Sequence, residues 1–391
     1  MIPLHSPYIS ANDIKKVTQT LKSGWVSTSG KVIEEFEDNI KTYTGAKFCI
    51  AVSSGTAALH LSLITAGVKK NHEVIVPTIS FIAPINAVRY ANANPIFMDS
   101  DKFFNISSLK VLEFIKKETK FKNGNTYNIK TKKIIKAIVM VHIFGNACDI
   151  EDVIKLCKKR NIVCIEDAAE GLGSRYIKGK YRGKHVGTIS EIGCISFNGN
   201  KIITTGAGGV LITNSKKIAT KARYLSTQAK SNEIDYIHND IGYNYKMPSI
   251  SASLGISQLQ SIDKFIEKKE KINMLYKKNF KSFSNLEIIS CPDYAKSNFW
   301  LNILNFPNIY SKKYIDELTI HLIKKKIQVR PIWKLNHMQK PYINFQSYKI
   351  SMAKKLYSSC ICLPSSYNLS VKEINFICEE IIIFSKKTNC I

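Results

Sequence analysis

Residues 196–201 read Ser-Phe-Asn-Gly-Asn-Lys, and residues 204–209 read Thr-Thr-Gly-Ala-Gly-Gly. Strand-like apolar segments flank this stretch, at Ile192–Ser196 before it and Gly209–Thr213 after it. The pattern predicts a loop of small residues between two strands, with Lys201 inside it. A lysine that is partly desolvated or held beside another cation becomes a nucleophile. A solvated loop lysine is the alternative, and the 51 lysines of the chain keep that alternative open.

A cluster of acids follows another expected strand. The sequence Glu166-Asp167-Ala168-Ala169-Glu170 comes directly after the apolar run 162–165, so we expect its carboxylates at the carboxyl end of that strand. Ligands of open α/β sheets bind at this end. An acid placed there could pair with a protonated pyridine nitrogen and keep such a ring an electron sink. A helix-capping acid explains the same pattern equally well.

A third segment, Ser53-Ser54-Gly55-Thr56, lies between an expected strand at Phe48–Val52 and an expected helix at 56–66. Glycine permits a tight turn, and the free backbone N–H groups at a helix start bind anions. The segment is therefore a hypothetical phosphate site. A plain strand-to-helix turn with a Ser or Thr cap is the alternative.

Short apolar runs alternate with amphipathic segments along the first part of the chain, which indicates α/β architecture. Further strands are expected at 74–76, 95–98 and 134–141. Helices are expected at 11–22, 82–90, 150–159, 250–280, 312–325 and 371–384. The character of the pattern changes after Pro248. We therefore expect a large α/β domain over residues 1–250, including the N-terminal helix, and a smaller α+β domain over residues 251–391.

The net charge of +27 could indicate a nucleic acid or an anionic membrane as partner. The distribution of the basic residues argues against both, because only six are arginine and the lysines are spread along the whole chain. Isoleucine and asparagine are also abundant, so a coding bias towards AT-rich codons is the simpler source. A field of this sign would still attract an anionic, phosphate-bearing substrate.

Other patterns narrow the class of protein further. The first ten residues lack the features of a signal peptide, and no apolar run is long enough for a membrane span, so we expect a cytoplasmic protein. The ten cysteines are scattered without a CxxC pair. We expect reduced, mostly buried thiols and no metal site.

Taken together and in this order, the three segments resemble those of nucleotide-sugar aminotransferases of the DegT/DnrJ/StrS type, a branch of the fold-type I pyridoxal phosphate (PLP) enzymes. The most specific matches are the stretch 196–201 and Asp240-Ile-Gly-Tyr-Asn-Tyr-Lys-Met-Pro248. Similar segments run from Gly24-Trp25-Val26-Ser27 to Leu363-Pro364-Ser365-Ser366, nearly the whole chain. The resemblance implies a large domain with a mixed, mostly parallel sheet flanked by helices, and a smaller C-terminal α+β domain.

The resemblance also implies a role for individual residues. Lys201 would carry the cofactor as a Schiff base and shuttle protons, and Asp167 would bind the pyridine nitrogen. Asn244 would reach the cofactor phosphate of a neighbouring subunit, which implies a homodimer with shared active sites. The remaining cofactor contacts would be Ser54, Gly55, Thr56 and Ser196 at the phosphate, Phe81 stacked on the ring, and Glu170 near the ring hydroxyl.

Finer details are most similar to the branch that serves legionaminic-acid-type sugars. Trp25, Arg330 and Trp333 would be substrate contacts there, although surface salt bridging and core packing explain Arg330 and Trp333 as well. Two positions depart from the family pattern, Lys246 where arginine is common and Ala207 where Glu or Gly is usual. We expect both to stand clear of the central chemistry.

The expected activity is amination at C4 of a nucleotide-linked 4-keto-6-deoxy sugar, with L-glutamate as amino donor. Two rivals remain. A sugar 3-dehydratase of the same family would have histidine in place of Lys201. A non-catalytic regulator would need a DNA-binding module, and the sequence shows no helix-turn-helix pattern.

Overall fold

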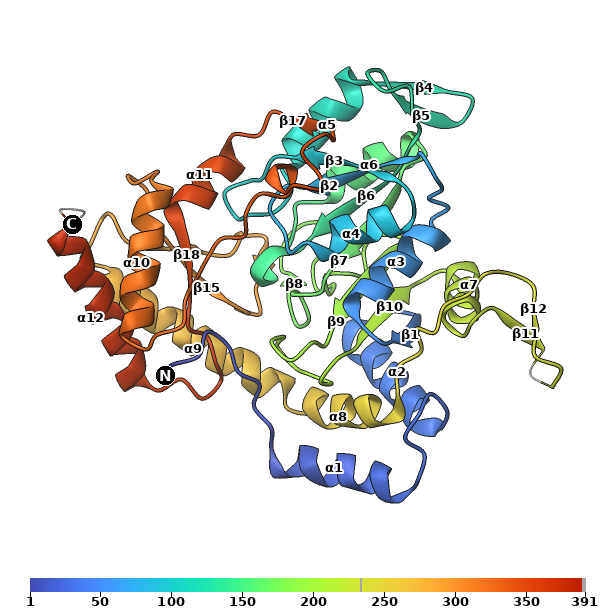
Figure 1. Ribbon diagram of the computed structural model, residues 1–391, viewed down its shortest axis with the longest axis horizontal. Coiled ribbons are helices and arrows are strands. Elements are labelled where there is room, and N and C mark those ends of the chain that lie inside the picture. Colours follow the sequence, from blue (N-terminus) through green and yellow to red (C-terminus); the bar gives the residue numbers. More distant parts are fainter. Residues whose placement is uncertain (233, 389–391) are drawn as a thin grey trace.

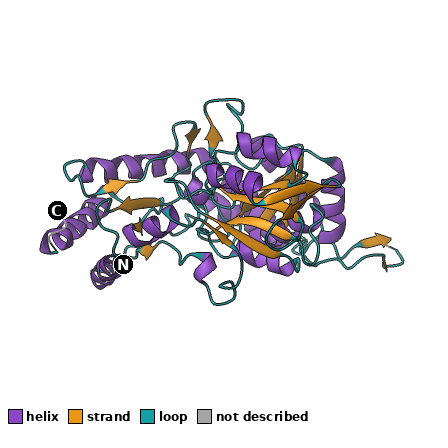
Figure 2. Cartoon of the chain, turned by 90° about the horizontal axis from the view of Figure 1, so that it is seen from above, coloured by secondary structure: helices purple, strands orange, loops and turns teal. Residues whose placement is uncertain are grey.

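The computed structural model describes residues 1–232 and 234–388. An eight-stranded sheet lies between two layers of helices (Figures 1 and 2). In spatial order its strands are β1 (Phe48–Val52), β10 (Gly209–Thr213), β9 (Ile192–Ser196), β7 (Val163–Asp167), β6 (Ile135–Val141), β2 (Glu73–Pro77), β3 (Asn94–Met98) and β17 (Ser347–Tyr348). All neighbouring pairs are parallel except those made by β10, which runs antiparallel to β1 and β9. The mixed, mostly parallel sheet expected from the sequence is confirmed.

Helices cover both faces of this sheet. One face carries α3 (Gly55–Thr65), α4 (Ala83–Tyr90) and α7 (Lys216–Ser226). The other carries α2 (Lys31–Thr44), α5 (Ser108–Lys117), α6 (Glu151–Lys159) and α8 (Ser249–Leu259), with α1 (Ala11–Lys22) packed on α8. Both faces of the strands are therefore buried, as parallel sheets require.

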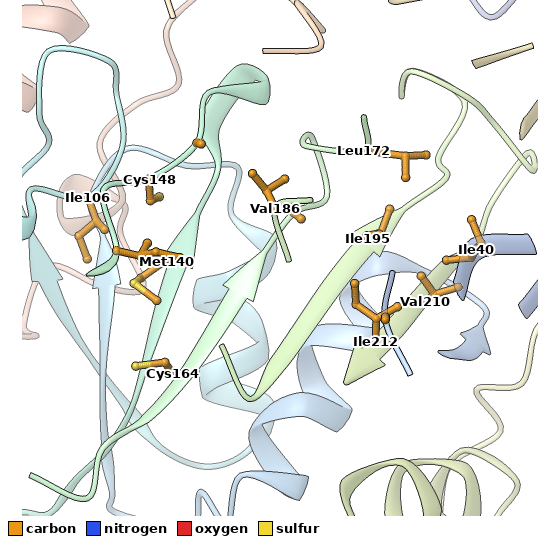
Figure 3. Packing of buried hydrophobic residues seen from close by; sticks show 14 of the residues in the cluster. Ile40, Ile106, Met140, Cys148, Cys164, Leu172, Val186, Ile195, Val210 and Ile212 are labelled. Atoms are coloured by element: carbon orange, nitrogen blue, oxygen red, sulfur yellow. The ribbon is translucent and has the colours of Figure 1, made fainter. Parts of the chain in front are cut away.

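The strands divide their side chains between two cores. In β10, Val210 and Ile212 belong to the core under α2 and α8, whereas Leu211 belongs to the core under α3. Successive side chains of a strand point to opposite faces, which explains this alternation. Figure 3 shows the first of these cores, with Ile195 of β9 and Val210 side by side.

A second, antiparallel sheet lies towards the C-terminal end of the chain. Its strands are β13 (Glu287–Ile288), β15 (Asn302–Asn305), β18 (Cys360–Leu363) and β16 (Arg330–Pro331). Three helices enclose a separate core with it: α9 (Ile262–Phe280), α10 (Lys312–Lys324) and α12 (Val371–Lys387). Figure 1 shows this part of the chain on one side of the large sheet, with the N-terminus near it.

The remaining elements connect or decorate these two parts. They are the hairpin β4 (Thr119–Lys122) and β5 (Asn125–Asn128), the 3₁₀ turns η1 (Ile143–Gly145) and η2 (Asn336–Met338), the pair β8 (Arg175–Tyr176) and β14 (Ala295–Lys296), and α11 (Met352–Ser359). A further hairpin, β11 (Lys230–Asn232) and β12 (Ile237–His238), projects away from the body (Figure 1).

The single helix expected over residues 250–280 is wrong. Two helices occupy this range, α8 and α9, and the chain turns at Gln260 and Ser261 between them. The reason is packing: α8 contacts α1 and α2 on the large sheet, whereas α9 contacts β13 and α12. The break between the two helices therefore falls where the packing partners change.

Several contacts cross the expected domain boundary. Residues Ser347–Tyr348 form β17 on the edge of the large sheet, beside β3. Ile2, at the other end of the chain, forms a bridge with Ile327 beside the small sheet. The division at residue 250 stays a prediction.

Two further observations concern membranes and thiols. None of the helices in the described residues is long and apolar enough to cross a bilayer. Nine cysteines are free thiols, of which Cys291 alone is partly exposed, and Cys390 lies outside the described residues.

Candidate active site

A cavity of about 380 Å³ lies at the carboxyl ends of the central strands. Its walls come from the segments that follow β1, β2, β7 and β9, and from Trp300 and Trp333 of the C-terminal part. It brings together nine of the residues predicted from the sequence: Ser54, Gly55, Thr56, Phe81, Asp167, Glu170, Ser196, Lys201 and Trp333. These residues lie at the end of the sheet where α/β folds bind ligands.

Lys201 projects into this cavity from the loop after β9. Its backbone N–H donates to the carbonyl of Asn198 at 2.9 Å, which closes a tight turn. The side chain is 12% exposed, so its amine is largely shielded from bulk water. The amine lies 3.5 Å from Oε1 of Glu170 and 4.1 Å from the ring centre of Trp300.

The side chains of the acidic segment 166–170 have two different roles: one supports a neighbouring loop and two face the cavity. Glu166 points away from the cavity, accepts N–H groups of Gly187, Ile189 and Ser190 at 2.7–2.8 Å, and lies 3.0 Å from Nε2 of His142. Burial acts to raise the pKa of Glu166, but His142 and the backbone N–H groups outweigh it and hold that pKa below its usual range. Glu166 therefore fixes the loop beneath the site.

Asp167 is the last residue of β7 and faces the cavity instead. Its Oδ1 accepts the N–H of Ala169 at 3.0 Å. Burial raises the pKa of Asp167 to about 6, and the nearby charge of Glu170 adds to the effect. A buried carboxylate with so few partners is well placed to receive a cationic group of a ligand.

Glu170 is the second acid of the cavity. Its Oε2 accepts the N–H of Phe144 at 2.7 Å. Burial raises the pKa of Glu170, and the positive charge of Lys201 opposes the rise. Capping of a helix, the alternative for this acidic segment, does not account for the contacts of Glu166, Asp167 and Glu170.

The start of α3 forms the anion-binding end of the cavity. The hydroxyl of Ser54 accepts the N–H of Ala57 at 3.0 Å and caps the helix. A Cβ on Gly55 would lie 2.8 Å from Cβ of Ser196, and a Cβ on Gly209 would lie 2.6 Å from the backbone nitrogen of Gly55. Only glycine fits these two positions, so the backbone closes tightly around the helix N-terminus. A phosphate fits this arrangement of free N–H groups and hydroxyls.

Aromatic side chains form another part of the cavity wall, and the ring of Phe144 packs behind them. Phe81 is 56% exposed and its ring lies 6.3 Å from that of Trp333. The ring of Phe144 stacks near both Trp333, at 5.1 Å, and Trp300, at 6.3 Å. The indole N–H of Trp300 donates to the carbonyl of Asn200 at 2.6 Å. Phe144 and Trp300 were missed by the sequence reasoning, since nothing local links them to Lys201.

Three predicted residues lie outside this cavity. Trp25 is 63% exposed, and the exposed Arg330 donates to the carbonyl of Val329. Asn244 is exposed beside Thr227, at the base of the projecting hairpin. Ala207, by contrast, lines the cavity, although the sequence led us to expect it clear of the chemistry.

The residues present fit PLP. Asp167 offers a buried carboxylate for a pyridinium nitrogen, the start of α3 offers an anion site, and Lys201 offers a shielded amine.

Comparison with known proteins agrees with this fit. The model of the DegT/DnrJ/EryC1/StrS aminotransferase family matches residues 7–382. The chain belongs to this family. The family assignment, the enzyme class and the PLP cofactor expected from the sequence are thereby confirmed: the protein is a PLP-dependent aminotransferase.

Relatives within the family cover essentially the whole chain. GDP-perosamine synthase of Escherichia coli O157:H7 is 36% identical over 380 residues, covering 97% of each chain. UDP-4-amino-4,6-dideoxy-N-acetyl-beta-L-altrosamine transaminase of Campylobacter jejuni is 30% identical, covering 99% of this chain and 98% of its own. The structure of Helicobacter pylori PseC, an aminotransferase involved in pseudoaminic acid biosynthesis, superposes with a TM-score of 0.86 at 24% identity over 99% of both chains.

Proposed function

We propose that this aminotransferase transfers the amino group of L-glutamate to C4 of a nucleotide-linked 4-keto-6-deoxy sugar that bears a 2-acetamido group. The observation that carries the proposal is the cavity in which Lys201, Asp167 and the start of α3 converge. An amino-sugar nucleotide as product is supported by the names of two relatives, GDP-perosamine synthase and a transaminase of a UDP-4-amino-4,6-dideoxy-N-acetyl sugar, and the acetamido group by the second name alone. The product would serve a surface glycan or a legionaminic-type acid, and the proposal places the enzyme in the cytoplasm.

Each residue has a stated task in this proposal. The bound cofactor supplies an electron sink for the bond that breaks at Cα of the donor. Asp167 keeps the pyridine nitrogen protonated, and the start of α3 with Ser196 holds the phosphate. Lys201 holds the cofactor between turnovers and afterwards moves the proton that leaves Cα. Glutamate becomes 2-oxoglutarate, and the carbonyl carbon of the sugar receives the amine.

A partner chain would complete the site. Asn244 lies outside the cavity of its own chain, on the exposed segment beside the hairpin β11–β12. We propose a homodimer in which Asn244 contacts the cofactor phosphate of the other subunit. Phe81 would stack on the ring, and Trp25, Arg330 and Trp333 would contact the sugar nucleotide.

The test is incubation of the purified enzyme with glutamate and a panel of UDP- and GDP-linked 4-keto sugars, with products identified by mass and NMR. We expect a 4-amino sugar, and parallel initial-rate lines when both substrates are varied, because the amine is stored on the enzyme between two half-reactions. Intersecting lines, or a product that has lost its C3 oxygen, would contradict the proposal. The second of these outcomes would favour the dehydratase.

A further inference from the structure

The amine of Lys201 contacts two side chains of the protein itself in the cavity, a carboxylate and an aromatic ring. Oε1 of Glu170 lies 3.5 Å from it, and the ring centre of Trp300 lies 4.1 Å from it. An ammonium group over the face of an indole within about 6 Å is attracted by the ring. The carboxylate and the ring face therefore form a cradle for a cation.

The cradle is held in place by contacts that do not involve Lys201. Oε2 of Glu170 accepts the N–H of Phe144, whose backbone has a positive φ of 56°, unusual for a residue other than glycine. The ring of Phe144 stacks near Trp300. The indole N–H of Trp300 donates to the carbonyl of Asn200. The backbone carbonyl of Trp300 accepts a hydrogen bond from Nζ of Lys269 at 3.1 Å.

The other charged groups near Lys201 show why Glu170 is the carboxylate that pairs with its ammonium group. Asp167 lines the same cavity and is close enough for the charge of Lys201 to oppose the rise in its pKa, but it is proposed to pair with the pyridine nitrogen. His5 and Lys269 line a small cavity beside Lys201. Burial lowers the pKa of His5 well below its usual range and that of Lys269 to about 7. Glu170 is thus the acid that can balance an ammonium group on Lys201.

We propose that Glu170 and the ring face of Trp300 form a docking site for the ammonium group of Lys201 whenever this side chain is not bonded to the cofactor. The inference rests on the proposed role of Lys201 as the cofactor-bearing residue. Glu170 and Trp300 are positioning residues in this account. They hold the displaced amine of Lys201 beside the reacting centre, so that it is in place to bond to the cofactor again.

The test uses the full-length protein loaded with pyridoxamine 5′-phosphate, which carries its own amine and leaves Lys201 free. Lys201 is labelled with a trace of acetic anhydride across a range of pH, and the labelled peptide is quantified against the exposed Lys184. Only the neutral amine reacts, so the midpoint of the labelling curve reports how strongly the cradle holds the ammonium form.

Two substitutions remove one partner each. Glu170→Gln keeps the shape of the side chain and its acceptor for Phe144 but removes the charge, so the labelling midpoint should fall by about one pH unit. Trp300→Leu removes the ring, so the midpoint should fall by about half a unit. Trp300→Phe keeps a ring face without the indole N–H, and its midpoint should stay near that of the parent. Trp333→Leu is the matched control. It also removes an indole ring, but one on the other side of Phe144 from Trp300, so the midpoint should stay unchanged.

Unchanged midpoints in both Glu170→Gln and Trp300→Leu would overturn the proposal. A shift in Trp333→Leu as large as that in Trp300→Leu would show that the ring of Trp300 has no specific part in holding the ammonium group. If Trp300→Leu fails to fold, Glu170→Gln decides alone, and an unchanged midpoint in that variant overturns the proposal. A separate portion of the same preparation, loaded with PLP and reduced with borohydride, shows whether Lys201 bears the cofactor at all. The two failures are therefore distinguishable.

Discussion

Adjacent residues with the same chemistry have different tasks in this site. Glu166 and Asp167 both end β7, but they point to opposite faces of the sheet, as neighbours in a strand must. Glu166 meets His142 and three backbone N–H groups, whereas Asp167 meets the cavity. A carboxylate that supports a loop is thus separated by one peptide bond from a carboxylate that can hold a cofactor.

The charge of Asp167, rather than its shape, should matter to the rate. Asp167→Asn keeps an acceptor for the N–H of Ala169 but cannot hold the pyridine nitrogen protonated, so the electron sink is lost. We expect turnover to fall by about a hundredfold or more while the fold and some cofactor binding remain. Steady-state kinetics beside circular dichroism and cofactor absorbance would check this. Turnover near that of the parent would move the ring-binding role to another residue.

The start of α3 depends on the absence of a side chain at Gly55. Gly55→Ala would place a carbon 2.8 Å from Cβ of Ser196, so the helix start or β9 must shift. We expect a loss of about 1–3 kcal/mol in the free energy of unfolding from this overpacking. Cofactor affinity, measured by titration of its absorbance, should fall at least about tenfold, the factor that 1.4 kcal/mol corresponds to. Gly199→Ala is the matched control, because its added carbon would meet no atom closer than 4.0 Å. Equal effects of the two substitutions would contradict the argument.

Helix α9 carries a buried amine that contacts two other segments of the C-terminal part of the chain. Nζ of Lys269 donates to the carbonyls of Trp300 and Ser365 at 3.1 and 2.6 Å, and burial lowers its pKa to about 7. In the unfolded chain the pKa is about 10.4. Between these two pH values the unfolded chain binds a proton that the folded chain does not, so this group's contribution to stability rises with pH across the window and is lowest below pH 7.

Lys269→Met removes this titration. The free energy of unfolding of the parent should gain up to about 1.4 kcal/mol per pH unit from this group between pH 7 and about 10.4, and the variant should lack that gain. Chemical denaturation at a series of pH values measures it. The same slope in both proteins would show that Lys269 keeps its proton in the folded chain.

Elements with local signals could be predicted from the sequence. Helix α1 begins and ends where expected, and Ser10 and Asp13 form a capping box at its start. The turn between α8 and α9 has no glycine or proline to mark it, and only the packing of the two helices on different partners reveals it. Trp300 and Phe144 were missed for a related reason: their relation to Lys201 exists only after the chain has folded.

At the scale of the whole molecule, the cavity lies where the large sheet meets the C-terminal part. The large sheet supplies Asp167 and Lys201, and the C-terminal part supplies Trp300 and Trp333. The exposed hairpin beside Asn244 projects away from this body (Figures 1 and 2). In the proposed homodimer, two chains related by C2 symmetry would each complete the other's site.

Complementation tests the shared site. Lys201→Ala and Asn244→Glu should each be inactive alone, but a mixed and refolded sample should contain hybrid dimers with one site that has both defects and one that has neither. Recovery of up to about half of the activity of a parent dimer follows for those hybrids. Asn239→Glu, a change at another exposed asparagine of the hairpin region, should stay active by itself. No recovery in a sample shown to contain hybrids would mean that one chain builds the whole site.

The central claim is that Lys201 bears the cofactor, and borohydride reduction of the PLP-loaded protein tests it most directly. Reduction makes the bond between cofactor and lysine permanent, and peptide mass spectrometry then locates it. We predict the phosphopyridoxyl group on the peptide that contains Lys201, and its loss together with the cofactor absorbance in Lys201→Ala. The buried Lys269, whose pKa is about 7, is the natural competitor beside Lys201. A phosphopyridoxyl group on Lys269 or any other lysine, with Lys201 unmodified, would contradict the account.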